Sequence, residues 1–154
     1  MTTVEYDIGS CHGGDADRVL AVDDKGGPGD GDVSMAICVA DLKRRSRLPR
    51  DTVVGTVMSN LGFEVAMREL GIAVVKTKVG DRYVLAEMRA MGAMLGGEQS
   101  GHIIFLEHNT TGDGLVTALQ LLSVMHSSGL PLSQLRTVMT RYPQVLKNIP
   151  VRDK

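Results

Sequence analysis

The sequence predicts an α/β fold with a mixed, largely parallel sheet and helices packed on it. From residue 52 onward, short β-branched runs alternate with amphipathic segments of helical period, as in strand–helix–strand units of a parallel-rich sheet. Apolar residues make up 43% and charged residues 23% of the 154 residues, which is enough apolar material for the core of one ordinary domain.

The first third of the chain predicts two strands and a helix. Residues 4–11 form a weak strand candidate, and VLAVDD at 19–24 forms a better one. The glycine-rich cluster at 24–29 predicts a turn. Apolar residues then recur at helical spacing over 32–44, and the cations that follow suit a helix C-terminus. We interpret KRRSR at 43–47 as a solvated helix end and linker, with a phosphate site as the alternative.

The remaining elements alternate regularly. We expect strands and helices in turn, with strands at 52–57, 72–79 and 102–106 and helices beginning near residues 60, 81, 111 and 133. Ligands of such folds bind at the carboxyl ends of the strands, so we expect a site at loops 58–60, 79–82 and 96–101.

Composition argues against several kinds of function. The net charge of −1 provides no field that would attract nucleic acid or an anionic membrane. Aromatic residues make up 3%, which argues against a base-stacking surface. No basic-apolar leader or long apolar run is present, so we expect a cytoplasmic protein without a membrane partner. Cys11 and Cys38 are expected to be buried, reduced thiols.

A glycine-rich acidic turn, GGDADRV at 13–19, is the first candidate for chemistry. Acids at alternate positions can aim their oxygens at one point, which suits Mg²⁺, a cation that often completes its shell with substrate phosphate. Asp15 and Asp17 are the candidate ligands, and Arg18 can pair with a phosphate. A plain acidic turn between strands is the alternative.

Two further polar strings follow strands. In KVGDRYV at 78–84, a strand ends at a glycine and a helix begins, and backbone N–H groups there favour an anion. A simple aspartate cap is the alternative. In LGGEQSGHI at 95–103, Glu98, Ser100 and His102 crowd a tight hairpin that can bind neighbouring sugar hydroxyls. The alternative for the histidine is an ordinary residue at the start of a strand.

Six strings, taken together and in order, resemble the α-D-phosphohexomutase family over nearly the whole chain. They are GDADRV, DGD, VVGTVMSNLGFE, KVGDRYV, LGGEQSGHI and TTGDGLVTALQLL. The resemblance implies the end of the family's second domain at 1–46, its third, sugar-binding domain at 47–140, and a linker toward a fourth domain at 141–154.

The resemblance also implies an activity. It points to the members that interconvert glucosamine 6-phosphate and glucosamine 1-phosphate, an isomerase step that supplies amino sugars for cell-wall precursors. A phosphoserine transfers phosphoryl groups there, and Mg²⁺ is the cofactor. Positioning and charge neutralisation dominate phosphoryl transfer, so acids, an arginine and a metal are the expected parts.

The same resemblance implies roles for single residues. Asp15 and Asp17 match metal carboxylates, and Arg18 matches a catalytic arginine near the phosphoryl group. The substrate-binding positions are Gly80, Asp81, Arg82, Glu98, Ser100 and His102.

The chain also departs from the family pattern. Gly13 stands where the family's metal loop has its first aspartate, so weaker Mg²⁺ binding is expected. The family's serine loop and fourth-domain phosphate loop have no counterpart in the sequence, so we expect the isolated chain to lack mutase activity. A non-catalytic phosphosugar-binding remnant is the alternative. Besides a phosphorylated hexosamine, complementary mutase fragments or further copies of the chain are the candidate partners.

Overall fold

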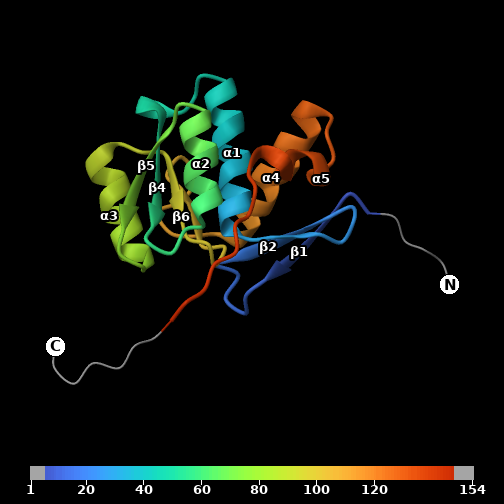
Figure 1. Ribbon diagram of the computed structural model, residues 1–154, viewed down its shortest axis with the longest axis horizontal. Helices are drawn as coiled ribbons and strands as arrows, with labels where there is room; N and C mark the ends of the chain where they lie inside the picture. Colours follow the sequence, from blue (N-terminus) through green and yellow to red (C-terminus); the bar gives the residue numbers. More distant parts are fainter. Residues whose placement is uncertain (1–5, 148–154) are drawn as a thin grey trace.

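The computed structural model describes residues 6–147, which form two small sheets and the helices packed around them (Figure 1). The first sheet is antiparallel and consists of β1 (Ile8–His12), β2 (Val19–Asp23) and β3 (Pro28–Gly29). The second sheet has the order β5-β4-β6-β7, with β4 (Thr52–Thr56), β5 (Ala73–Thr77), β6 (Leu95–Gly97) and β7 (Ile103–Phe105). Strand β4 is parallel to β5 and β6, and β7 is antiparallel to β6. The predicted mixed, largely parallel sheet is confirmed.

Helices cover both faces of the second sheet. They are α1 (Gly31–Arg44), α2 (Leu61–Glu69), α3 (Asp81–Met91), α4 (Gly114–Ser128) and α5 (Leu132–Leu135), with 3-10 turns η1 (Pro49–Asp51) and η2 (Arg136–Val138). Helices α1 and α2 lie side by side on one face, and α4 packs beside α1 (Figure 1). Helix α3 covers the opposite face.

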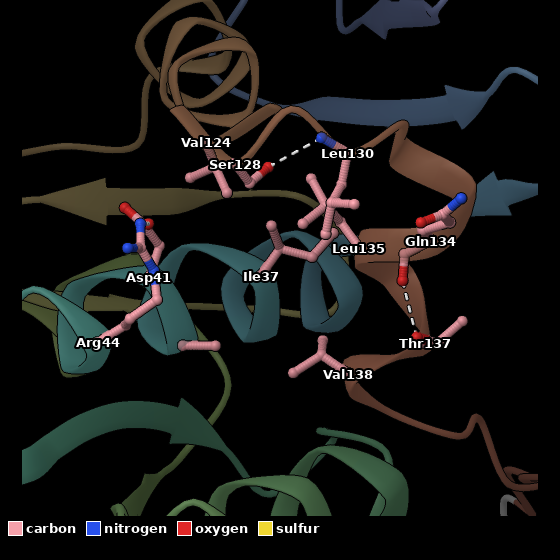
Figure 2. A pocket seen from close by; sticks show the side chains of 11 residues that line it. Ile37, Asp41, Arg44, Val124, Ser128, Leu130, Gln134, Leu135, Thr137 and Val138 are labelled. Atoms are coloured by element: carbon pink, nitrogen blue, oxygen red, sulfur yellow. Dashed lines mark hydrogen bonds and ion pairs between the residues drawn. The ribbon is translucent and has the colours of Figure 1, made fainter. Parts of the chain in front are cut away.

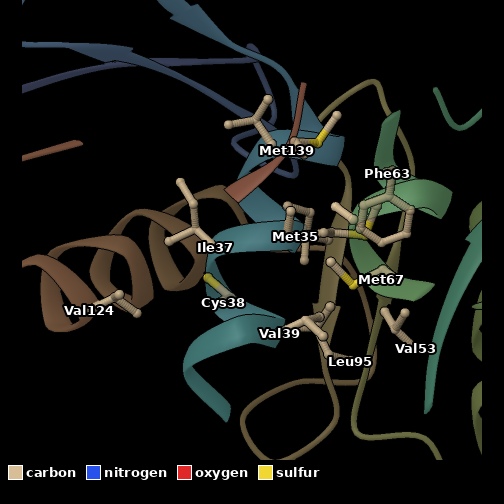
Figure 3. Close-up of a cluster of buried hydrophobic side chains, with 14 of the residues drawn as sticks. Met35, Ile37, Cys38, Val39, Val53, Phe63, Met67, Leu95, Val124 and Met139 are labelled. Carbon is tan, nitrogen blue, oxygen red and sulfur yellow. The ribbon is translucent and has the colours of Figure 1, made fainter. Parts of the chain in front are cut away.

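Side chains alternate between the two faces of this sheet, as the strand geometry requires. Val53, Leu95 and Ile103 join the larger core under α1 and α2. Val54 and Ile104 join the smaller core under α3. Figure 3 shows the larger cluster, to which the helices contribute Met35, Val39, Phe63 and Met67.

Local side-chain signals explain where three helices begin. Asp30 caps α1 by accepting a 3.2 Å hydrogen bond from the Val33 N–H. Asn60 caps α2, with 2.9 Å from its Oδ1 to the Gly62 nitrogen. Asp113 caps α4 in the same way. Each cap satisfies an N–H group that has no partner inside its helix.

Two short strands and one cap differ from the sequence prediction. Strands β3 and β6 have two and three residues, end in glycine and lack β-branched side chains, so no strand signal marks them. Ser133 lies inside α5 instead of capping it. Its N–H donates to Asp24 Oδ1 at 3.1 Å, which ties α5 to the hairpin of the first sheet.

The two cysteines are free but lie in different environments. Cys38 is buried in the core, as predicted, and burial raises the pKa of its thiol to about 12, which excludes it as a nucleophile at neutral pH. The prediction of a buried Cys11 is wrong. Cys11 is exposed, as are its neighbours Ser10 and His12 in the second half of β1.

Helix α1 shares its core with the segments that follow residue 46. Met35 and Val39 pack in the same cluster as Val53 and Phe63. The domain boundary between residues 46 and 47 stays a prediction. Residues 148–154 of the expected linker lie outside the described residues.

An ion pair between the buried Asp23 carboxylate and the partly exposed Arg136 guanidinium holds the first sheet to η2. Arg136 Nη1 donates to Asp23 Oδ2 at 2.6 Å, and Nη2 donates to the Pro28 carbonyl at 2.9 Å. Burial alone would raise the pKa of Asp23. The hydrogen bonds from Arg136 and from the N–H groups of Gly27 and Lys25 outweigh burial and lower the pKa.

We therefore expect Arg136→Met to lower the free energy of unfolding by about 3 kcal/mol, because the Asp23 carboxylate stays buried without its countercharge. The control Arg47→Met breaks the exposed pair with Glu107 and should cost less than about 1 kcal/mol. Urea denaturation at neutral pH measures both, and equal losses would contradict the structural role of the buried pair.

Candidate functional site

A cleft of 560 Å³ opens where β4 and β6 end, beside the first sheet. Its lining comes from all three loops predicted to form a site and from the first sheet, α1 and the C-terminal segment. The residues are Arg18, Leu20, Asp30, Thr56, Met58, Val79, Glu98, Gln99, Ser100 and Arg141. Two arginines, two carboxylates and two hydroxyls thus surround one hollow, a set that suits a polar ligand carrying an anionic group.

The loop between β6 and β7 presents Glu98 and Ser100 to the cleft. It closes as a tight turn in which the Glu98 N–H donates to the His102 carbonyl at 2.9 Å and the Gly101 N–H donates to the Glu98 carbonyl at 3.0 Å. Glu98 Oε1 accepts a 2.9 Å hydrogen bond from the Gly80 N–H, which fixes the carboxylate. Ser100 is exposed, so its hydroxyl is accessible to a ligand.

The same loop is docked on the N-terminus of α1 by direct backbone contact. The Gly31 N–H donates to the Gln99 carbonyl at 2.9 Å. A Cβ at residue 31 would lie 2.1 Å from the Glu98 carbonyl oxygen, so only glycine permits this approach. On the other side, the Val19 N–H donates to the Gly101 carbonyl at 3.2 Å. The loop, α1 and the first sheet therefore form one continuous wall of the cleft.

His102 lies behind this wall and is only 4% exposed. Its Nε2 accepts a 3.0 Å hydrogen bond from the Gly112 N–H, and its Nδ1 lies 3.2 Å from Asp17 Oδ2. A backbone N–H can only donate, so Nε2 is unprotonated and Nδ1 carries the hydrogen that bonds Asp17. Both ring nitrogens are thus used within the protein. The predicted contact of His102 with sugar hydroxyls stays a prediction.

The acidic turn gathers two carboxylates around Gly13. A Cβ there would lie 3.1 Å from Asp15 Oδ1 and 3.7 Å from Asp17 Oδ1. Asp17 Oδ1 is buried without a hydrogen-bond partner among the described residues, and Arg18 Nε lies 3.7 Å away. The neighbouring Asp17 side chain and backbone N–H groups lower the pKa of the exposed Asp15. Within residues 6–147, no group of three or more His, Cys, Asp or Glu side chains is placed to hold a metal.

The loop at the start of α3 contributes to the site through its backbone. The Gly80 N–H holds Glu98, as described above. Arg82 turns along its own helix, where Nη2 donates to the Tyr83 hydroxyl at 2.6 Å and the guanidinium lies 4.6 Å from the ring centroid. Asp81 is exposed and bonds the Arg82 N–H.

Of the predicted residues, the structure brings Arg18, Glu98 and Ser100 together in the cleft. The other predicted residues do not line the cleft. Gly80 supports Glu98, Asp17 contacts His102, and the side chains of Asp15, Asp81 and Arg82 lie elsewhere.

Sequence reasoning missed two acids at the start of α1. Asp30 lines the cleft, and Asp32 lies beneath it with no exposed surface. Asp32 Oδ2 accepts a 2.6 Å hydrogen bond from the Asn60 N–H, whereas Oδ1 has no partner among the described residues. Burial, reinforced by the nearby charge of Asp30, raises the pKa of Asp32 to about 6. Both acids stand in the DGD string at 30–32, whose place before a helix does not by itself indicate a site.

The C-terminal segment also reaches the cleft, which a linker assignment does not predict. Asn60 holds it on both sides of Tyr142, since Oδ1 accepts from the Tyr142 N–H at 2.9 Å and Nδ2 donates to the Tyr142 carbonyl at 2.8 Å. Gln144 Nε2 donates to the Met58 carbonyl at 3.0 Å. These bonds place Arg141 at the rim of the cleft.

A second hollow lies between α1, α4 and α5, with a volume of 340 Å³ (Figure 2). Its lining is mostly apolar. Its charged residues, Asp41 and Arg44, hydrogen-bond each other at 2.6 Å. The cleft is therefore the better candidate for a reactive site.

The basic run is an ion-paired helix end. Lys43 pairs with Asp51, Arg45 pairs with Asp41, and Arg47 pairs with Glu107. These carboxylates pair with the cations locally, in agreement with the interpretation of a helix end and against the phosphate-site alternative.

Among the described residues, no single helix is long and apolar enough to cross a membrane. The pair Gly114–Ser128 and Leu132–Val138 has the length and composition of a membrane span only when its two helices are taken together, and they are bent by 93°.

Comparison with known proteins decides the family. Residues 30–142 match the family described as phosphoglucomutase/phosphomannomutase, alpha/beta/alpha domain III. The chain belongs to the phosphoglucomutase/phosphomannomutase family. The layers seen here, α1 and α2 on one face of the sheet and α3 on the other, agree with that description.

Two curated relatives of the chain carry the same name, phosphoglucosamine mutase. The chain is 59% identical over 148 residues to a phosphoglucosamine mutase of Desulforamulus reducens, with 96% of the chain and 33% of the relative covered. It is 61% identical over 154 residues to a phosphoglucosamine mutase of Pelotomaculum thermopropionicum, covering 100% of the chain and 35% of the relative. The chain thus spans about a third of the length of these relatives.

Solved structures of the superfamily share the fold. A phosphoglucomutase/phosphomannomutase family protein of Burkholderia thailandensis matches with a TM-score of 0.78 and 26% identity, over 93% of this chain and 30% of that one. An N-acetylphosphoglucosamine mutase of Aspergillus fumigatus, in complex with GlcNAc-6P and magnesium, matches with a TM-score of 0.68 and 20% identity, over 87% of this chain and 33% of that one. The second likeness concerns the fold alone.

The buried Asp32 beneath the cleft predicts a pH dependence of stability. Its folded-state pKa of about 6 lies above the ordinary value of 3.8, so the folded chain binds more protons between these values. The stability that Asp32 contributes is complete below the lower value and is lost as the pH rises through the higher one. Asp32→Asn removes this ionisation.

We expect the unfolding free energy of the variant, relative to wild type, to rise by about 2–3 kcal/mol between roughly pH 4 and pH 7. Urea denaturation at both pH values measures this difference. Glu69→Gln, at an exposed position at the end of α2, is the charge-matched control and should show no such trend. A parallel pH profile for Asp32→Asn and wild type would contradict the prediction.

Proposed function

We propose that the chain provides the sugar-binding domain and part of the metal loop of a phosphoglucosamine mutase, which interconverts glucosamine 6-phosphate and glucosamine 1-phosphate. In this proposal residues 47–140 correspond to the third domain and residues 1–46 to the end of the second. The observation that carries it is the meeting of Arg18, Glu98 and Ser100 in one cleft of a chain about 60% identical to proteins of that name.

The sugar is proposed to bind against the loop between β6 and β7. The Glu98 carboxylate, fixed by Gly80, can accept hydrogen bonds from two neighbouring hydroxyls, and the exposed Ser100 hydroxyl can donate or accept beside it. Val79 and Met58 supply apolar surface for the ring. Because the loop is docked on Gly31, these groups need little reorganisation when the sugar binds.

The phosphoryl end is proposed to lie near Arg18 and the acidic turn. Arg18 is half exposed, so its guanidinium is free to pair with phosphate oxygens. The unpartnered, buried Asp17 Oδ1 and the nearby Asp15 Oδ1 are hard oxygen donors, which fits Mg²⁺. Mg²⁺, when bound, would neutralise charge on the transferring phosphoryl group. His102 holds Asp17 in place through Nδ1.

Binding of the sugar phosphate to the chain tests this proposal. We expect glucosamine 6-phosphate to bind weakly, and Glu98→Ala to reduce the affinity at least about tenfold by removing a charged acceptor. Saturation-transfer difference NMR titrations measure both. The control Glu69→Gln should leave the affinity unchanged. No binding by wild type, or equal binding by the Glu98 variant, would contradict the proposed site.

We propose further that the 154-residue chain does not catalyse the isomerisation by itself. The family's phosphoserine loop has no match in the sequence, so the chain offers no phosphoryl donor. A coupled assay for glucosamine 1-phosphate should detect no turnover, and turnover would overturn this part of the proposal.

Gly13 favours a second candidate function, a phosphosugar-binding remnant that has lost the metal. Restoring the carboxylate with Gly13→Asp distinguishes the two. Because a Cβ at residue 13 lies beside both Asp15 and Asp17, we expect the variant to bind Mg²⁺ about tenfold more tightly or better, as measured by calorimetric titration. Gly14→Asp, whose Cβ meets nothing within 4 Å, is the matched control. Equal Mg²⁺ affinities of Gly13→Asp and wild type would argue against a metal loop.

A further inference from the structure

The cleft contains one carboxylate that the proposed reaction does not use. Asp30 lines the cleft on the side of α1, and its side chain is 13% exposed. Its Oδ1 already accepts a hydrogen bond, because it caps α1 through the Val33 N–H at 3.2 Å. Its Oδ2 has no hydrogen-bond partner among the described residues. The nearest cation is Arg141, whose Nε lies 3.5 Å from Oδ2, beyond a good hydrogen-bond distance.

Arg141 is a loosely held counter-ion. Its side chain is 59% exposed, and the segment that carries it is fixed through the Tyr142 backbone and Gln144 rather than through Arg141 itself. The guanidinium can therefore leave Asp30 without breaking those bonds. A ligand cation that enters the cleft can take its place, and Arg141 is then free to approach the anionic end of the same ligand.

The surroundings of Asp30 favour a cation at this position. Asp32 is buried behind it, and the two carboxyls repel each other strongly enough to contribute to the titration of Asp32. The helix start offers N–H groups to Oδ1 only, through Val33. The remaining charged groups that line the cleft are Arg18, Arg141 and Glu98. Glu98 Oε1 already accepts from Gly80, whereas Asp30 Oδ2 has only the ion pair with Arg141 at 3.5 Å.

We infer that Asp30 selects the amino group of a hexosamine phosphate, with its Oδ2 accepting a hydrogen bond from the ligand's ammonium in place of the ion pair with Arg141. The inference rests on the proposed function and names the feature of the substrate that this site distinguishes. A hexose carries a neutral hydroxyl at the position of the amine, and an N-acetylated hexosamine carries a neutral amide. Neither compensates the Asp30 charge, so both should bind less tightly than the ammonium form.

Amide-shift NMR titrations of the whole chain test this assignment with three ligands. These are glucosamine 6-phosphate, glucose 6-phosphate and N-acetylglucosamine 6-phosphate. Wild type should bind the first about tenfold more tightly than either of the others, since a charge-assisted hydrogen bond is lost in both. The Val33 amide reports directly on Asp30, because it donates to the same carboxylate, and it should shift with the amine ligand much more than with glucose 6-phosphate.

Asp30→Asn keeps an oxygen to cap α1 and removes the charge. We expect it to bind all three ligands within about twofold of one another, at the affinity that wild type shows for glucose 6-phosphate. Glu69→Gln, which changes the net charge equally outside the cleft, should retain the wild-type preference.

The outcomes separate this inference from the proposed function. If wild type binds all three ligands equally, or if Asp30→Asn keeps the preference for the amine, Asp30 is not the selecting residue while the sugar-phosphate site stands. If wild type binds none of the three, the proposed function fails and this inference fails with it.

Discussion

The contact between Gly31 and the 98–101 turn is the constraint on which the rest of the site depends. It joins the first turn of α1 to the loop between β6 and β7 through a 2.9 Å backbone hydrogen bond, with no room for a side chain between them. Because α1 is also the central helix of the core, the position of Glu98 and Ser100 is set by the packing of the whole domain. A loop carrying so much polar chemistry is therefore as well fixed as an element of secondary structure.

Contacts with distant residues also fix the acidic turn at 13–19. His102, at the start of β7, reaches across to Asp17, and the Gly114 N–H donates to the Ala16 carbonyl at 2.9 Å. These contacts anchor the turn to the start of β7 and to the first residue of α4. The wall of the cleft and the acidic turn consequently share their supports, so a change in one is expected to reach the other. This coupling suits a reaction in which a sugar ring and a phosphoryl group must be positioned together.

Much of this architecture follows from periodicity and loop chemistry. The alternation after residue 52 predicts the sheet, and the carboxyl-end rule predicts which loops meet, because both express local geometry that tertiary packing does not override. Asp32 and Arg141 could not be found in this way. The pKa of Asp32 is raised only because the fold buries this side chain, beside the Asn60 N–H. Arg141 reaches the cleft only because Asn60 holds Tyr142. The side-chain direction of His102 likewise depends on Asp17, a neighbour distant in sequence.

We propose that a phosphorylated amino sugar binds in the cleft between the first sheet and the 98–101 turn. The most direct test is a crystal structure of the chain grown with glucosamine 6-phosphate. We expect density for the sugar against Glu98 and Ser100, with its phosphate toward Arg18. Density in the apolar groove between α1, α4 and α5, with an empty cleft, would contradict it.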